Sequence, residues 1–84
     1  MEEKTAYIAI PGGLQARAAA QFVQEANQYH SDLFLEYQSV RVNAKSIMGI
    51  MSLALSEGTQ VKVVAEGNDE AVAAQALVNF ITNS

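Results

Sequence analysis

Apolar and polar residues alternate in four short stretches of the chain, and this alternation predicts β-strands. The stretches are TAYIAI at 5–10, LFLEY at 33–37, VRVN at 40–43 and QVKVVAE at 60–66. Successive side chains of a strand point to opposite faces, so Ala6, Ile8 and Ile10 share one face of the first strand. Such strands have one apolar face for a core and one polar face for water.

Three further stretches repeat their apolar residues at helical spacing. The first runs from Gln15 to about Gln28, the second is short and follows Ser46, and the third follows Gly-Asn-Asp at 67–69. Asp69, or the asparagine before it, suits the N-cap of the third helix. The apolar positions of the first helix are Ala16, Ala19, Phe22, Val23 and Ala26. In the third helix we expect Ala73, Leu77, Phe80 and Ile81 to form the buried side.

The predicted element order is β-α-β-β-α-β-α, which is typical of an α+β fold. We expect the helices to cover one face of an antiparallel sheet and to leave the other face in water. The chain has no internal repeat, low-complexity tract or linker, so we expect one domain over residues 1–84.

The short middle helix is more apolar than one packing stripe requires. At about 100° per residue its apolar side chains form two separate sectors. One sector comprises Ile47, Met48 and Met51, and the other comprises Ile50 and Leu53. We expect the second sector, helped by Leu55, to enter the core and the first to remain exposed as an adaptable surface for a partner. The alternative is that all five side chains are simply core residues.

Ser46 stands where this helix begins, and serine is a common N-cap. A phosphate on the same hydroxyl would gain about 0.3–1 kcal/mol from the helix dipole. That gain is small beside the roughly 5–15 kcal/mol that stabilise a domain. Phosphorylation of Ser46 would therefore change the charge of the surface next to the apolar sector and leave the fold unchanged.

Composition argues against several classes of function. Nine Asp and Glu against five Lys and Arg give a net charge of −4, with no cationic run for direct nucleic-acid binding. Cysteine is absent, which removes thiol catalysis and cysteine metal sites and suits a reducing cytoplasm. We expect no metal and no cofactor. No apolar run reaches the roughly 18 residues of a membrane span, and the acidic start does not suit a signal peptide.

Three features together resemble the HPr family of the bacterial sugar phosphotransferase system. They are GLQARAAAQFVQEAN at 13–27, NAKSIMGIMSL at 43–53, and the strand, Gly-Asn-Asp and helix at the end of the chain. The resemblance covers essentially the whole chain. It implies an HPr-like open-faced β-sandwich, in which three helices cover one face of a four-stranded antiparallel sheet.

HPr proteins carry a phosphoryl group on a histidine at the start of the first helix, and the matching residue here is Gln15. A carboxamide is neither nucleophilic nor titratable near neutral pH, so Gln15 cannot replace that imidazole. The only histidine, His30, is expected at the far end of the same helix, in water. The chain also has Ala18 where the family usually has proline, and Ser39 where its second hairpin usually has glycine. We expect a protein that is not an enzyme.

The resemblance implies a regulatory role for a family member that keeps only the serine. HPr kinase/phosphorylase would phosphorylate Ser46, and the phosphorylated form would bind CcpA, a LacI-type regulator, as corepressor in carbon catabolite repression. The candidate partner contacts are Gln15, Arg17, Ala20, Lys45, Ile47, Met48 and Met51.

Two other functions remain open from the sequence. One is a phosphocarrier of the phosphotransferase system, which Gln15 opposes. The other is a regulator that binds a metabolic enzyme without phosphorylation. We also predict that two chains can form a homodimer by exchanging their N-terminal strands, because Pro-Gly-Gly at 11–13 can act as a hinge.

Overall fold

The computed structural model describes residues 1–82 and has the predicted order of elements. The strands are β1 (Glu2–Tyr7), β2 (Asp32–Tyr37), β3 (Val40–Asn43) and β4 (Gln60–Glu66). The helices are α1 (Ala16–Ala26), α2 (Ile47–Ser52) and α3 (Glu70–Thr82).

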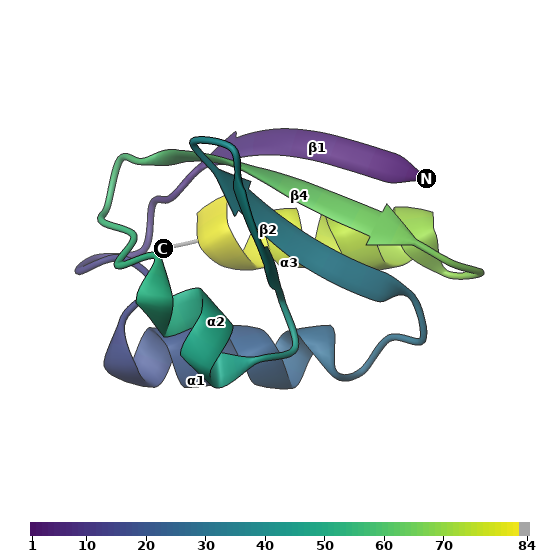
Figure 1. The fold of residues 1–84 in the computed structure, drawn as a ribbon, viewed down its shortest axis with the longest axis horizontal. Helices are drawn as coiled ribbons and strands as arrows, with labels where there is room; N and C mark the ends of the chain where they lie inside the picture. Colours follow the sequence, from purple (N-terminus) through teal and green to yellow (C-terminus); the bar gives the residue numbers. More distant parts are fainter. Residues whose placement is uncertain (83–84) are drawn as a thin grey trace.

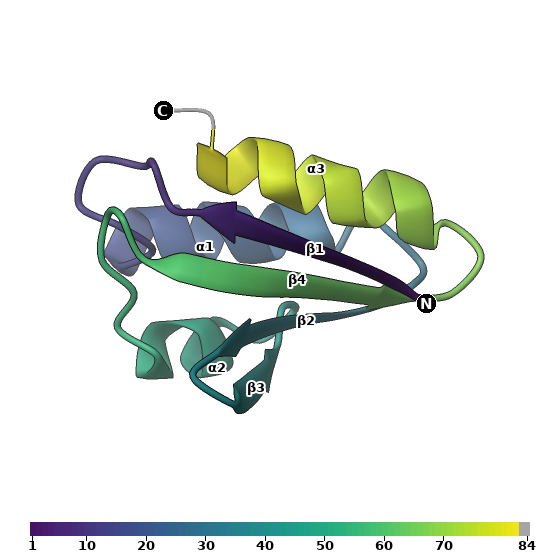
Figure 2. The same cartoon turned by 90° about the horizontal axis from the view of Figure 1, so that it is seen from above.

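The four strands form one sheet in the order β1-β4-β2-β3, and every neighbouring pair is antiparallel. All three helices lie on the same side of this sheet (Figures 1 and 2). Helix α3 packs against β1 and β4, and α1 packs against both α2 and α3. The predicted fold class, an open-faced α+β sandwich, is therefore confirmed.

The core lies between the sheet and the helices. In β4 the alternating residues Val61, Val63 and Ala65 are buried, as their spacing predicts. Helix α1 contributes Phe22, whose ring meets that of Phe80 edge to face, with 5.7 Å between the ring centroids. Phe80 was expected to be buried but is only half-buried, because it packs at the margin of the core.

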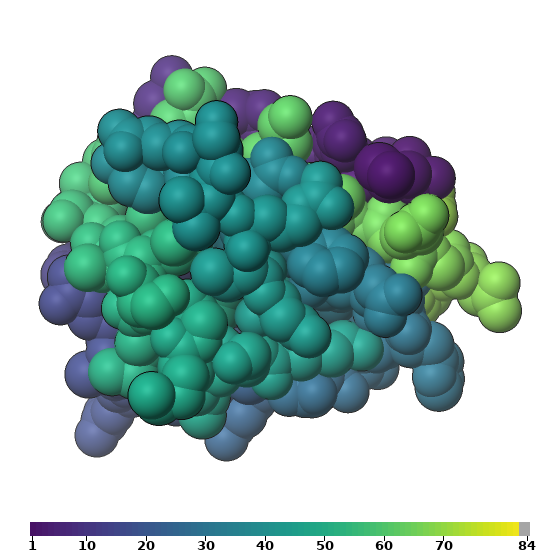
Figure 3. Space-filling model, in the orientation of Figure 1, coloured from purple at the N-terminus to yellow at the C-terminus, as the bar shows by residue number. Residues whose placement is uncertain are grey.

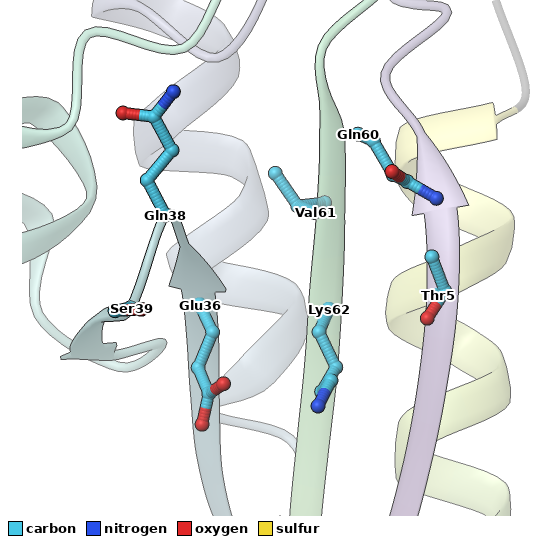
Figure 4. A pocket seen from close by; sticks show the side chains of 7 residues that line it. All are labelled: Thr5, Glu36, Gln38, Ser39, Gln60, Val61 and Lys62. Carbon is cyan, nitrogen blue, oxygen red and sulfur yellow. The ribbon is translucent and has the colours of Figure 1, made fainter.

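The opposite face of the sheet is mostly polar, as predicted. A shallow hollow of about 360 Å³ lies on this face beside the turn between β2 and β3, and Figure 4 shows the seven side chains that line it. Val64 departs from the predicted pattern, because it is apolar on this face and only 1% exposed. Its strand neighbour Phe34 carries the guanidinium of Arg41 5.1 Å from its ring centroid, and Arg41 also pairs with Glu36.

The observed boundaries of β1 and α1 differ from the predicted ones. Strand β1 begins at Glu2 rather than Thr5 and ends at Tyr7, because its first residues pair with the end of β4. Beyond Ile8 the chain turns towards α3, and the N–H of Ala9 donates to the carbonyl of Ile81 at 2.7 Å. Helix α1 spans Ala16–Ala26 and thus ends two residues before the predicted Gln28.

The turn between β2 and β3 has φ of +49° at Gln38 and +68° at Ser39. Two successive positive φ values are typical of a tight type I′ hairpin turn, which favours glycine or asparagine. Serine at this turn therefore occupies a left-handed conformation that glycine adopts at lower cost.

Asp69 directly precedes α3, and its backbone carbonyl accepts from the N–H of Ala73 at 2.9 Å, but its carboxylate binds the turn before β2. It accepts hydrogen bonds from the N–H groups of His30 and Ser31, both at 2.9 Å, and from the Ser31 hydroxyl. These bonds, that of the Ser31 hydroxyl above all, lower the pKa of Asp69 from 3.8 to about 2. Asp69 therefore stands at the predicted N-cap position, and its side chain ties the turn before β2 to the start of α3.

Within residues 1–82, no helix has the length and apolar character needed to cross a membrane. The same residues contain no group of three or more histidine, aspartate or glutamate side chains suited to a metal ion.

Candidate functional site

Ser46 is the N-cap of α2. Its Oγ accepts a hydrogen bond from the N–H of Gly49 at 3.1 Å, and its carbonyl accepts from the N–H of Ile50 at 3.0 Å. The capping prediction for Ser46 is confirmed. The Ser46 side chain is half-buried, at the edge of the surface that α2 presents.

Helix α2 is anchored from one side only. Ile50 is completely buried, Leu55 is 1% exposed just beyond the helix, and Leu53 packs partly against the core. These are the residues that the sequence assigned to the core. Their burial fixes which side of α2 faces away from the protein.

The other sector of α2 forms an exposed apolar surface, here called the methionine patch: Ile47, Met48 and Met51. These side chains are 44%, 79% and 45% exposed, respectively. The predicted exposure is confirmed, and the alternative that all five apolar side chains enter this chain's core is wrong. Figure 3 shows the teal and green atoms of α2 on the outer surface of the molecule.

The start of α1 lies beside the end of α2. Gln15 is exposed and has an extended backbone, and its side chain makes no capping hydrogen bond. A hollow of about 220 Å³ is lined by Gln15, Ala16, Met51 and Ala54. The structure therefore brings Gln15 and the methionine patch onto one continuous surface.

Two alanines in this hollow have strained backbones. Ala16, the first residue of α1, has φ of +49°, and Ala54, just after α2, has φ of +48°. A left-handed conformation costs a residue with a Cβ about 1–2 kcal/mol. Ala16, one of the apolar residues that recur at helical spacing in α1, is exposed here. Nothing in the local sequence indicated strain at either alanine.

The loop before α1 is held against the residues after α2. Leu14 and Leu55 form an isolated antiparallel bridge, and the N–H of Leu14 donates to the carbonyl of Leu55 at 3.0 Å. Ala18 keeps a backbone N–H that donates to the carbonyl of Gln15 at 3.1 Å, a bond that proline could not make. The start of α1 therefore forms with alanine at this position.

Three further residues with predicted partner contacts lie on or near this surface. Arg17 is exposed in the first turn of α1, and no residue within 1–82 forms an ion pair or hydrogen bond with its side chain. Ala20 is half-buried one turn further on. Lys45 is tied down instead, because its Nζ donates to the carbonyl of Tyr29 at 2.8 Å. The sequence did not indicate this bond, which places a positive charge at the carboxyl end of α1.

Charge is distributed unevenly around the site. All nine carboxylates lie outside the segments 11–24 and 37–56, which supply the start of α1 and the whole of α2. The same two segments carry three cations, Arg17, Arg41 and Lys45. The two segments therefore carry no carboxylate although the protein is acidic as a whole, and of their three cations Arg41 is paired with Glu36. The exposed His30 lies at the other end of α1, as predicted.

A small protein with this sheet, these helices and a capped serine beside an apolar patch matches one known family over nearly its whole length. The family described as the PTS HPr component phosphorylation site matches residues 2–83. The chain belongs to the HPr family.

Among the relatives, two are HPr-like proteins called Crh. That of Halalkalibacterium halodurans is 52% identical over 81 residues, covering 96% of each chain. That of Bacillus subtilis is 51% identical over 81 residues, covering 96% of this chain and 95% of its own. The chain is thus an HPr-family protein close to Crh.

Solved structures of the family share this architecture. The phosphocarrier protein HPr of Bacillus anthracis is 48% identical and superposes with a TM-score of 0.93, covering 95% of both chains. The Crh of Bacillus subtilis is 49% identical with a TM-score of 0.80, covering 100% of this chain and 97% of its own, and is described as a swapped, intertwined dimer.

Proposed function

We propose that this protein is a regulatory HPr-like protein without enzymatic activity, which HPr kinase/phosphorylase phosphorylates on Ser46 in the cytoplasm. In the phosphorylated form it binds CcpA, a LacI-type transcription regulator, and acts as its corepressor in carbon catabolite repression. The similarity to the HPr family, and to relatives called Crh, supports this assignment.

The observation that carries the proposal is the exposed methionine patch directly after Ser46. A short helix with Ile50 already completely buried needs no second apolar face for its own stability. Exposed apolar surface of this kind is typical of a contact with another protein. Flexible, polarizable methionine side chains suit such a contact because they adapt to the partner's shape.

Phosphate on Ser46 acts on the surface rather than on the fold. It adds about −1.5 to −2 charges at pH 7 to a surface whose own segments carry no carboxylate. A partner can therefore read the phosphate through arginine or lysine while it covers the neighbouring methionine patch. Gln15, Arg17, Ala20 and Lys45 are proposed as further contacts, with Lys45 leaving the Tyr29 carbonyl to make one.

Gln15 opposes a phosphocarrier role. Its exposed carboxamide is well placed at the start of α1 but offers no nucleophile for a phosphoryl group. His30, the only histidine, lies at the far end of the helix with its backbone N–H bound to Asp69. Incubation with phosphoenolpyruvate and Enzyme I tests this directly. We expect no labelled phosphate on His30, and label there would favour the phosphocarrier alternative.

Treatment with HPr kinase/phosphorylase and ATP, followed by mass spectrometry, tests the modification. We expect a single phosphate on Ser46 and none in Ser46→Ala. Ser52→Ala is the matched control, because Ser52 lies on the same helix and its hydroxyl donates to the carbonyl of Gly49. Loss of phosphorylation in Ser52→Ala with retention in Ser46→Ala would contradict the proposal.

Pull-downs from cell extract distinguish the remaining alternative, a metabolic-enzyme regulator that works without phosphate. Under our proposal, capture of the CcpA-type regulator depends on Ser46 and disappears in Ser46→Ala. An enzyme captured equally by both proteins, with no regulator captured, would favour the alternative.

We also propose that the protein can form a homodimer by exchange of β1. The strand pairs with β4 through Glu2 to Tyr7, and the Pro-Gly-Gly hinge follows it at 11–13. The swapped dimer described for the Bacillus subtilis Crh supports this proposal. Light scattering across a wide concentration range tests it, and a monomer at every concentration would contradict it.

A further inference from the structure

Two of the chain's three methionines, Met48 and Met51, lie in the methionine patch beside Ser46. Cysteine is absent, so methionine thioethers are the only sulfur groups in the protein. Met48 is 79% exposed, the highest value for a large apolar residue within 1–82, and Met51 is 45% exposed. A dissolved oxidant therefore reaches both thioethers while the protein remains folded.

We propose that the methionine patch is a redox-sensitive modification site, where oxidation of Met48 to the sulfoxide blocks docking of the phosphorylated protein. The inference deepens the proposed function and rests on it, since docking through this patch belongs to that function. Phosphorylation of Ser46 then favours docking, and oxidation of Met48 on the same surface opposes it.

The oxidant is a hydroperoxide such as hydrogen peroxide. A lone pair of the methionine sulfur attacks one peroxide oxygen, and the S–O bond forms as the O–O bond breaks. The other oxygen takes up the proton of the transferred oxygen and leaves as water. Sulfur loses the two electrons that the peroxide gains. A dithiol-dependent sulfoxide reductase reverses the step: two thiols become a disulfide and the sulfoxide oxygen leaves as water.

The exposures predict an order of oxidation within the patch. Met48 projects into water, whereas Met51 lies against the hollow that Gln15 and Ala54 also line. Met48 therefore reacts first. Met1 is 64% exposed as well, but the N-terminus lies at the opposite end of the molecule from α2 (Figures 1 and 2). Its oxidation serves as an internal control that does not touch the proposed docking surface.

Oxidation of Met48 leaves the fold intact and changes only the contact. The sulfoxide stays in water in the free protein, and α2 remains anchored by the buried Ile50. In a docked complex the same group is a strong hydrogen-bond acceptor enclosed in an apolar contact. Enclosing it without a donor weakens binding, and we expect a loss of affinity of about tenfold or more.

The experiment uses protein phosphorylated on Ser46, treated with hydrogen peroxide and then desalted, so that the regulator is never oxidised. Mass spectrometry maps the sulfoxides, and titration calorimetry measures the dissociation constant for the CcpA-type regulator. Met48→Leu/Met51→Leu, which keeps Met1, is the matched variant, and each protein is compared with its own untreated form. Thermal unfolding, followed by circular dichroism, verifies that the treated proteins are folded.

We expect Met48 to be oxidised before Met51, and the dissociation constant of the wild type to rise about tenfold or more on oxidation. The double variant should show a ratio near one, and sulfoxide reductase with dithiol should restore wild-type binding. Unchanged wild-type affinity with Met48 fully oxidised overturns the inference, as does an equal loss in the double variant. If untreated phosphorylated protein does not bind at all, the proposed function itself fails.

Discussion

Replacing Gly13 with alanine tests how the loop before α1 is held against the residues after α2. Gly13 is buried and has φ of +78°. A Cβ built on it would lie 2.2 Å from the carbonyl oxygen of Leu55 and 2.8 Å from the Cα of Ser56. Both neighbours are backbone atoms, so the clash cannot be relieved by rotating a side chain.

Gly12 provides the matched control. Its φ is +83°, but a Cβ built on it would meet nothing within 4 Å. Gly12→Ala therefore carries only the left-handed backbone cost, about 1–2 kcal/mol, reduced by about 0.4–1 kcal/mol because alanine restricts the unfolded chain. We expect Gly12→Ala to lower the free energy of unfolding by about 1 kcal/mol or less.

Gly13→Ala carries the same backbone cost and must also displace Leu55. That displacement breaks the bridge between Leu14 and Leu55 and leaves buried backbone groups without partners, which costs about 1–3 kcal/mol more. We expect a total loss of about 2–4 kcal/mol. Urea unfolding followed by circular dichroism measures both variants. Equal losses in Gly12→Ala and Gly13→Ala would refute the reasoning.

Three other predictions concern stability. Ser39→Gly should raise the free energy of unfolding, measured in urea, by about 0.5–1 kcal/mol, because glycine adopts the positive φ at lower cost. A lower free energy of unfolding would contradict the assigned turn. Ile50→Ala should lower it by about 2–5 kcal/mol, whereas Met48→Ala on the same helix should change it by less than about 0.5 kcal/mol; similar losses would contradict the assigned faces of α2. Because the folded state lowers the pKa of Asp69 from 3.8 to about 2, its contribution is present above pH 3.8 and is lost as the pH falls through about 2. As the pH falls through that range, the urea midpoint of Asp69→Asn should fall less steeply than that of the wild type. An equal dependence of the two midpoints on pH would exclude a contribution from the Asp69 carboxylate.

The periodicity of the chain was sufficient for the element order and for the two faces of α2. Burial on one side leaves a repeating pattern in the sequence, and Ile50 and Met48 stand in opposite sectors of it. The N-terminal edge strand was harder to delimit. Glu2 and Glu3 precede its apolar residues and resemble a loop, although they pair with β4.

Long-range contacts and backbone strain could not be predicted from local patterns. The partners of Asp69 lie 38 and 39 residues away, and the carbonyl that holds Lys45 lies 16 residues away. Ala16 and Ala54 have positive φ values that alanine disfavours, so their residue type argues against the conformation they adopt. In each case tertiary structure imposes what the local sequence does not indicate.

The affinity of the CcpA-type regulator for this protein with and without phosphate on Ser46, measured by titration calorimetry, tests the central claim most directly. A charge-assisted contact to phosphate adds roughly 1.5–3 kcal/mol, so phosphorylation should lower the dissociation constant at least about tenfold. The melting temperatures of the two forms should remain nearly equal. Equal dissociation constants for the two forms would contradict the account, and so would tighter binding accompanied by a changed fold.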